Sequence, residues 1–100
     1  MANGTIQNTP VVKYYDTGYM QLNNLSWVAT AAGKYAAPVN VSNISGQIIS
    51  VCINAISRLK TTDNVIPYMT GNSGVALMSN TSSFDSVGSG AQISLMIVYI

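Results

Sequence analysis

The sequence contains no histidine and no glutamate, and its only acids are Asp16, Asp63 and Asp85. Histidine and the carboxylates are the usual general bases of hydrolytic enzymes, and histidine also completes the Ser-His-Asp triad and most zinc sites. Each aspartate stands beside turn-forming residues and far from the other two in sequence, which favours solvated or turn-capping carboxylates over a catalytic pair. We therefore expect no enzyme, no metal site and no cofactor.

Cysteine occurs once, as Cys52. A lone cysteine cannot form an intrachain disulfide, so the fold lacks the covalent support of small secreted scaffolds, and folding in a reducing cytosol is compatible with this. Because Cys52 lies in an apolar segment, we interpret it as a small buried hydrophobic residue and not as a nucleophile.

Charged residues are also scarce, at 7% of the chain against about 25% in typical soluble domains. The polar surface depends instead on neutral side chains, namely twelve Ser, ten Asn, eight Thr and four Gln. The basic residues Lys13, Lys34, Arg58 and Lys60 form no stripe of the kind that binds a phosphate backbone, so we expect no nucleic-acid partner. No apolar run approaches the roughly 20 residues of a membrane span, and we expect no membrane insertion.

The hydrophobic content of the chain, 48% with a net charge of +1, gives it little protection against association. Residues 1–10 are polar and without periodicity, and we interpret them as an N-terminal arm or a junction with something upstream. Residues 11–100 then form one small domain. Self-association is the simplest way to cover the apolar surface of such a domain.

Short apolar segments separated by turn-forming residues about every ten positions predict an all-β fold, an antiparallel β-sandwich of about seven to eight short strands. We expect a first hairpin from Val11–Tyr15 and Tyr19–Leu22, which flank Asp16-Thr17-Gly18. Further strands are expected over LSWVAT, after the turn at AAGK, across Val39, Val41 and Ile44, in VIPYM and VALMS on either side of GNSG, and over Gln92–Ile100 after a long Ser/Gly loop.

The segment Gln47–Leu59 fits two patterns. Its apolar residues recur partly at helical spacing, but Ile49, Val51 and Ile53 also alternate with smaller or polar residues in the two-residue period of a strand. The β-branched residues favour the strand, because branching at Cβ restricts side-chain rotamers in a helix and suits a pleated surface.

The last eight residues, ISLMIVYI, are apolar on both faces of the expected strand. One face carries Ile93, Leu95, Ile97 and Tyr99, and the other carries Met96, Val98 and Ile100. A strand on the outside of a two-layer sandwich has one wet face. We therefore expect this strand to be central, covered by another layer or pressed against a neighbouring subunit.

Aromatic residues gather near the first expected hairpin. Sugar-binding surfaces combine an aromatic face with Asn or Asp side chains that fix hydroxyl groups, and tyrosine and tryptophan also dominate protein interfaces. Trp27 fits such a surface or the sandwich core. Adjacent strand residues face opposite ways, so at least one of Tyr14 and Tyr15 is expected to be exposed. The candidate glycan-binding residues are Tyr14, Tyr15, Asp16, Tyr19, Asn23 and Asn24.

Three stretches after Trp27 resemble the C-terminal receptor-binding tip domain of bacteriophage tail fibres, particularly in phages of Gram-positive and gut bacteria. They are GKYAAPVNVSNISGQIISVCINA, which resembles a pair of strands joined at Ser45-Gly46, then NVIPYMTGNSGVALMS, and the closing ISLMIVYI. The resemblance covers about 70 residues. Its most distinctive part is VIPYM followed by a Gly/Asn turn and a hydrophobic strand.

This resemblance implies a homotrimeric β-sandwich head, with the last strand near the threefold axis, that attaches a virion tail to a host-surface saccharide or protein after folding in the bacterial cytoplasm. It assigns no individual binding residue. A structural trimerisation or virion assembly module without ligand binding is the alternative, and an adhesin or pilus-like subunit is a third hypothesis.

Overall fold

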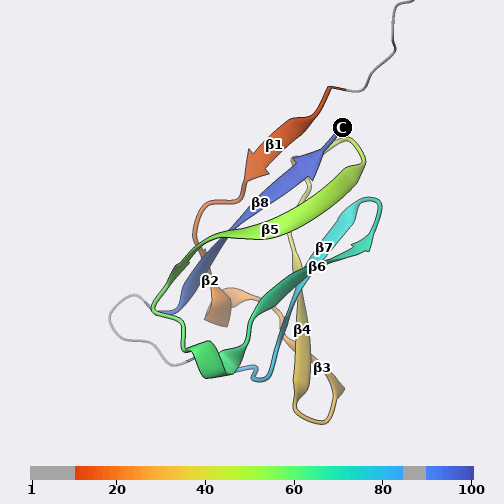
Figure 1. The fold of residues 1–100 in the computed structure, drawn as a ribbon. Coiled ribbons are helices and arrows are strands. Elements are labelled where there is room, and N and C mark those ends of the chain that lie inside the picture. The colour runs from red at the N-terminus through yellow and green to blue at the C-terminus, as the bar shows by residue number, and fades with distance from the viewer. Residues whose placement is uncertain (1–10, 85–89) are drawn as a thin grey trace, which may run out of the picture.

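The computed structural model describes residues 11–84 and 90–100, and within them the chain is all-β (Figure 1). The expected N-terminal arm and residues 85–89 of the Ser/Gly loop lie outside the described residues. The elements are β1 (Lys13–Asp16), β2 (Met20–Gln21), the 3₁₀ turn η1 (Leu22–Asn24), β3 (Val28–Ala31), β4 (Lys34–Val39), β5 (Ile48–Ser57), the 3₁₀ turn η2 (Thr61–Asp63), β6 (Ile66–Gly71), β7 (Gly74–Ser79) and β8 (Gln92–Tyr99).

The first sheet, which we call the β8 sheet, is built around its last strand. β5 pairs along one edge of β8, and β1 and β2 follow one another along the other edge, all antiparallel to β8. The expectation that a strand with two apolar faces is central is therefore confirmed. Figure 1 shows β8 lying between β1 and β5.

The expected first hairpin is wrong. β1 and β2 both run antiparallel to β8 and do not pair with each other, so they form one interrupted edge strand. The connection stays attached to β8, because the Thr17 N–H donates to the Leu95 carbonyl at 3.0 Å and the Leu95 N–H donates to the Thr17 hydroxyl at 3.0 Å. Asp16-Thr17-Gly18 is thus a break in an edge strand, with Gly18 at φ +68°, and not a chain reversal.

The second sheet, which we call the β7 sheet, has the order β3-β4-β7-β6. The turns expected at AAGK and GNSG are both confirmed, and each closes a hairpin: β3 pairs with β4 around Ala32-Gly33, and β6 pairs with β7 around Asn72-Ser73. Gly33 has a φ of +68°, the left-handed conformation that tight hairpin turns require of glycine.

Two expectations about the chain after β4 are wrong. Val41 and Ile44 do not extend the strand beyond Val39, because they form a turn in which the Ile44 N–H donates to the Val41 carbonyl at 2.9 Å. The strands flanking Ser45-Gly46 are not a pair either, since β4 belongs to the β7 sheet and β5 to the β8 sheet. Residues 40–47 cross from one sheet to the other.

β5 resolves the ambiguity of Gln47–Leu59 in favour of the strand. Its register against β8 shifts between Ile48 and Ser50 and again between Ile53 and Ala55. The residues opposite the inward-facing Tyr99, Ile97, Leu95 and Ile93 are consequently Ile48, Val51, Ile53 and Ile56. Their spacing of three, two and three residues explains why the sequence shows both a helical and a strand period.

Cys52 is exposed, so the expectation of a buried cysteine is wrong. It lies between the two register shifts and opposite Met96, whereas its neighbours Val51 and Ile53 lie opposite the buried Ile97 and Leu95. Its side chain therefore points to the outer face of the β8 sheet.

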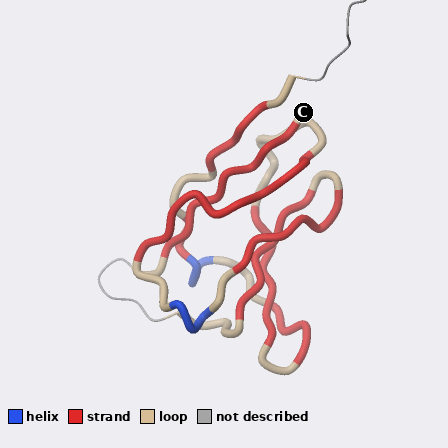
Figure 2. The backbone as a smooth tube through the Cα atoms, in the orientation of Figure 1, coloured by secondary structure: helices blue, strands red, loops and turns tan. Residues whose placement is uncertain are grey.

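The core lies between the two sheets, an arrangement compatible with the expected β-sandwich. Both 3₁₀ turns lie at the end of the fold away from the C-terminus (Figure 2). The buried cluster consists of Leu22, Val39, Ile48, Val65, Val75, Leu77, Phe84, Ala91, Ile93, Leu95 and Ile97.

Candidate functional site

The six candidate glycan-binding residues follow one edge of the β8 sheet, along β1, the connection to β2, and η1 (Figure 1). They do not share one face. Tyr14 lies opposite the outward-facing Val98, whereas Tyr15 lies opposite the buried Ile97. The clustering in sequence therefore does not produce a single aromatic platform.

Tyr14 and Tyr19 are the two exposed tyrosines among these residues, at 69% and 56% of their surface. Tyr15 is half-buried, and its hydroxyl accepts a hydrogen bond of 3.0 Å from the Asn43 amide. The expectation that at least one of the adjacent tyrosines is exposed is confirmed. Tyr14 and Tyr19 remain available for contact with a ligand or another chain.

The Asp16 carboxylate is engaged within the fold. It accepts hydrogen bonds from the Gly18 N–H at 2.9 Å, from the Ser94 hydroxyl at 2.8 Å and from the Asn54 amide at 3.3 Å. The bond from the Gly18 backbone is the largest cause of a lowered pKa for Asp16, and the bonds from Ser94 and Asn54 add to it against the opposing effect of burial. This carboxylate holds the edge-strand break against β8.

The Asn23 side chain also forms hydrogen bonds within the fold. Its amide N–H donates to the Phe84 carbonyl at 2.6 Å, and its amide oxygen accepts from the Phe84 N–H at 2.8 Å. The Phe84 ring lies against Trp27 with 5.1 Å between ring centroids, and the Trp27 indole N–H donates to the Leu22 carbonyl at 2.7 Å. Trp27 therefore belongs to the border of the core, while Asn24 is exposed.

The outer face of the β8 sheet mixes apolar and polar residues. Its apolar residues on β5 and β8 are Cys52, Met96 and Val98, and we call them the β8 outer face. Asp16 lies opposite Met96, Ser50 lies opposite Val98, and Tyr14 lies at the edge on β1. Met96 and Val98 are only half-buried, whereas Ile93, Leu95 and Ile97 on the inward face are fully buried, so the described residues cover the outer face of β8 less completely than the inward face.

The outer face of the β7 sheet is apolar across all four strands. Val28, Ala36, Met78 and Ile66 stand opposite one another from β3 to β6, and we call this row the β7 outer face. Val28 is 62% exposed and Ile66 is 44% exposed. An antiparallel sheet whose outer face meets water normally carries polar residues there, so this row is unusual.

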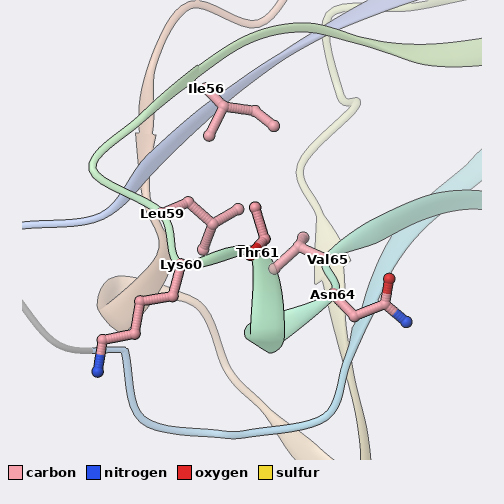
Figure 3. Close-up of a pocket in the computed structure, with 6 residues that line it drawn as sticks. All are labelled: Ile56, Leu59, Lys60, Thr61, Asn64 and Val65. Carbon is pink, nitrogen blue, oxygen red and sulfur yellow. The ribbon is translucent and has the colours of Figure 1, made fainter.

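A hollow of about 290 Å³ opens where β5 ends and β6 begins, and it is the cavity that the close-up in Figure 3 draws. Its lining residues are Ile56, Leu59, Lys60, Thr61, Asn64 and Val65. Sequence reasoning missed this hollow. The only signal was the pair of apolar residues Leu59 and Val65 at the two ends of an otherwise polar loop, and such a pair has no distinctive period.

No group of histidine, cysteine and acidic side chains suited to a metal ion occurs in residues 11–84 and 90–100. Over the same residues, no helix has the length and apolar character needed to span a membrane. Comparisons with protein-family models, with curated proteins and with solved structures gave no match for this chain.

Proposed function

We propose that this chain is the non-enzymatic receptor-binding tip of a bacteriophage tail fibre, acting as a homotrimer that recognises host-surface glycan. The observation that carries the proposal is the incomplete cover of β8. Ile93, Leu95 and Ile97 on its inward face are fully buried, while Met96 and Val98 on the opposite face are apolar and only half-buried by the described residues. A neighbouring copy of the chain supplies the missing cover.

The β8 outer face supports association between copies, because it presents Cys52, Met96 and Val98 together on one side of the sheet. Tyr14 lies on the edge strand β1, outside this contact, and is left for the glycan. Burial of such apolar residues favours association. Low net charge adds no electrostatic repulsion between copies.

The glycan part of the proposal depends on Tyr14 and Tyr19, because both rings are exposed. The apolar face of a sugar ring packs against an aromatic ring, and three copies of a weak site gain avidity by effective concentration. Asp16 and Asn23 contribute by holding this edge in place, since their side chains are engaged within the fold.

Light scattering of the full chain tests the assembly. A solution mass near three times 10.6 kDa is expected, and a stable monomer would overturn it. The Cys52 thiol provides a second measurement, because cover of the β8 outer face slows its reaction with a thiol reagent. The matched control is Ser73→Cys in a Cys52→Ser background, which places the thiol in the exposed β6–β7 turn and should react at an unhindered rate.

Binding to bacterial cells tests the glycan site. The double variant Tyr14→Ala, Tyr19→Ala should bind a susceptible host at least about tenfold more weakly, the size of effect seen when a central interface aromatic is removed. Tyr15→Phe is the control, because it keeps the half-buried ring and removes only the hydroxyl that faces Asn43. Unchanged binding by the double variant would dispose of this site.

The β7 outer face favours one alternative, a structural assembly module without a ligand. Its exposed row from Val28 to Ile66 fits cover by another protein of the same particle. This alternative predicts that the chain binds no cell in a panel of Gram-positive and gut bacteria and that Ile66→Lys prevents fibre assembly. Cell binding that persists in Ile66→Lys would exclude it.

A further inference from the structure

Ile56 lies near the end of β5, an edge strand of the β8 sheet, and like Ile53 on the same face it is only partly covered. Its partner across the ladder, Ile93, is fully buried, and the two side chains lie on the same inward face of the β8 sheet. Ile56 is nevertheless 48% exposed. The inward face is open at this point because the hollow lies between Ile56 and the start of β6.

η2 forms the wall of the hollow opposite Ile56, and hydrogen bonds from the end of β7 hold it in place. The Asp63 carbonyl accepts hydrogen bonds from the buried Ser79 hydroxyl at 2.7 Å and from the Asn80 N–H at 3.1 Å. The Asn80 amide also donates to the Thr62 carbonyl at 3.2 Å. These hydrogen bonds from the end of β7 therefore hold η2 in place, and the hollow is preformed.

The backbone on both sides of this wall is strained. Arg58 has a φ of +58° and Asn64 a φ of +51°, and they are the only non-glycine residues with positive φ in the described part of the chain. Asn64 closes η2 in the left-handed conformation that asparagine tolerates, but arginine rarely adopts it. Such strain is concentrated at ligand-binding sites, because the surrounding structure must compensate for it.

The chemistry of the hollow limits what it can bind. Ile56, Leu59, Thr61 and Val65 point into the same space, while the Lys60 ammonium and the Asn64 amide point away from it at the rim (Figure 3). Within the described residues the Thr61 hydroxyl makes no hydrogen bond, so it is available to a ligand. None of the described residues that line the hollow is aromatic, so a bare sugar ring finds no flat surface among them to pack against.

We propose that this hollow binds the N-acetyl group of an amino sugar. The acetyl methyl group contacts the aliphatic side chains of Ile56, Leu59 and Val65, and the acetamido group exchanges a hydrogen bond with the Thr61 hydroxyl. The sugar hydroxyls then lie at the polar rim. About 290 Å³ is close to the lower limit for ligand pockets, and it leaves room for the acetamido group of one sugar residue. This inference rests on the proposed glycan recognition. It specifies N-acetylated amino sugars as the ligand class and adds the hollow as a second binding site.

Amide NMR of the full chain tests the assignment, with N-acetylglucosamine and glucose as the two probes. N-acetylglucosamine should shift the signals of the residues lining the hollow, and glucose should leave them unchanged. Thr61→Val should weaken the binding about five- to tenfold, the effect of one lost neutral hydrogen bond. Ile56→Asn should abolish it, and Thr61→Val keeps the test valid if Ile56→Asn fails to fold.

Two matched variants serve as controls. Ile49→Asn changes an isoleucine of similar exposure on the same strand outside the hollow, and Thr62→Val changes the neighbouring threonine, which does not line it. Both should bind like the unmodified chain, and weakening by either to the same extent would overturn the assignment.

The remaining outcomes separate this inference from the proposed function. In one outcome, N-acetylglucosamine shifts only the NMR signals of Tyr14 and Tyr19. In another, host cell-wall glycan retains the chain but N-acetylglucosamine has no effect. Either outcome would contradict binding in the hollow and leave the proposed glycan recognition intact. No binding of any glycan would overturn both.

Discussion

The Ser94 hydroxyl donates a hydrogen bond of 2.8 Å to Asp16, although 78 positions separate the two residues in the sequence. Ser94 is buried on the outer side of β8, and Asp16 ends β1 beside the break in the edge strand. The bond thus joins the first strand of the domain to its last. It shows that an acid selected as a ligand-binding candidate has a structural partner.

Stability should depend on the ionisation of Asp16. Hydrogen bonds from Gly18, Ser94 and Asn54 lower its pKa in the folded chain below the ordinary value of about 3.9. Its contribution is therefore present above about pH 4 and is lost as the pH falls through the lower pKa of the folded state. Urea unfolding between about pH 2 and pH 6 should show a loss of stability for the unmodified chain that is smaller in Asp16→Asn. Parallel curves for the two proteins would contradict this assignment.

Asn23 and Asn24 should respond very differently to substitution by alanine. Asn23→Ala removes both hydrogen bonds to Phe84 and should lower the free energy of unfolding by about 1–3 kcal/mol, because the Phe84 backbone loses its partners. Asn24→Ala changes an exposed side chain and should cost less than about 0.5 kcal/mol. Chemical denaturation of both variants measures the difference, and equal losses would show that the paired bonds contribute nothing.

Gly46→Ala should destabilise the fold. A Cβ atom at this position would overlap the carbonyl oxygen of Ile100, which accepts a hydrogen bond of 3.0 Å from the Gln47 N–H. Because the obstacle is backbone, relief requires the end of β8 to shift, and we expect a loss of about 1–3 kcal/mol. Ser45→Ala alters the exposed neighbour and should unfold like the unmodified chain in thermal denaturation. An unchanged free energy of unfolding in Gly46→Ala would mean that the connection over residues 40–47 can shift without cost.

Substitutions at Ile97 and Val98 should affect folding and assembly separately. Ile97→Ala empties a fully buried position and should cost about 2–5 kcal/mol in the free energy of unfolding. Val98→Asp changes the β8 outer face, so it should leave a folded chain that sediments as a monomer and exposes Cys52 to thiol reagents. An unchanged oligomer in Val98→Asp would place the contact between copies elsewhere.

The strand pattern was largely predictable from local chemistry. The β3–β4 and β6–β7 hairpins follow from turn residues placed between short apolar segments, and these signals involve neighbours in the chain. Asp16-Thr17-Gly18 has similar turn chemistry, but the expected hairpin does not form because β8 offers both flanking segments a partner. Local propensity was outweighed there by pairing with a distant strand.

The candidate site was less predictable than the fold. Exposure of Tyr14 or Tyr15 followed from the alternation of strand residues, whereas the engagement of Asn23 depends on Phe84, which is 61 positions away. The alternation of Cys52 with Val51 and Ile53 gives its direction relative to them, but its exposure depends on how far the rest of the fold covers the outer face of the β8 sheet. The hollow beside Ile56 arises between two sheets and has no sequence signature of its own.

By itself, the sequence determined the all-β class, two of the hairpins and the central place of the strand with two apolar faces. Each of these depends on side-chain alternation and on turn residues that act over a few positions. Only the tertiary structure decided which polar side chains are used internally, which way Cys52 points and where the hollow opens. Those features depend on contacts between residues far apart in the chain, and such contacts exist only once distant strands have paired and the two sheets have packed together.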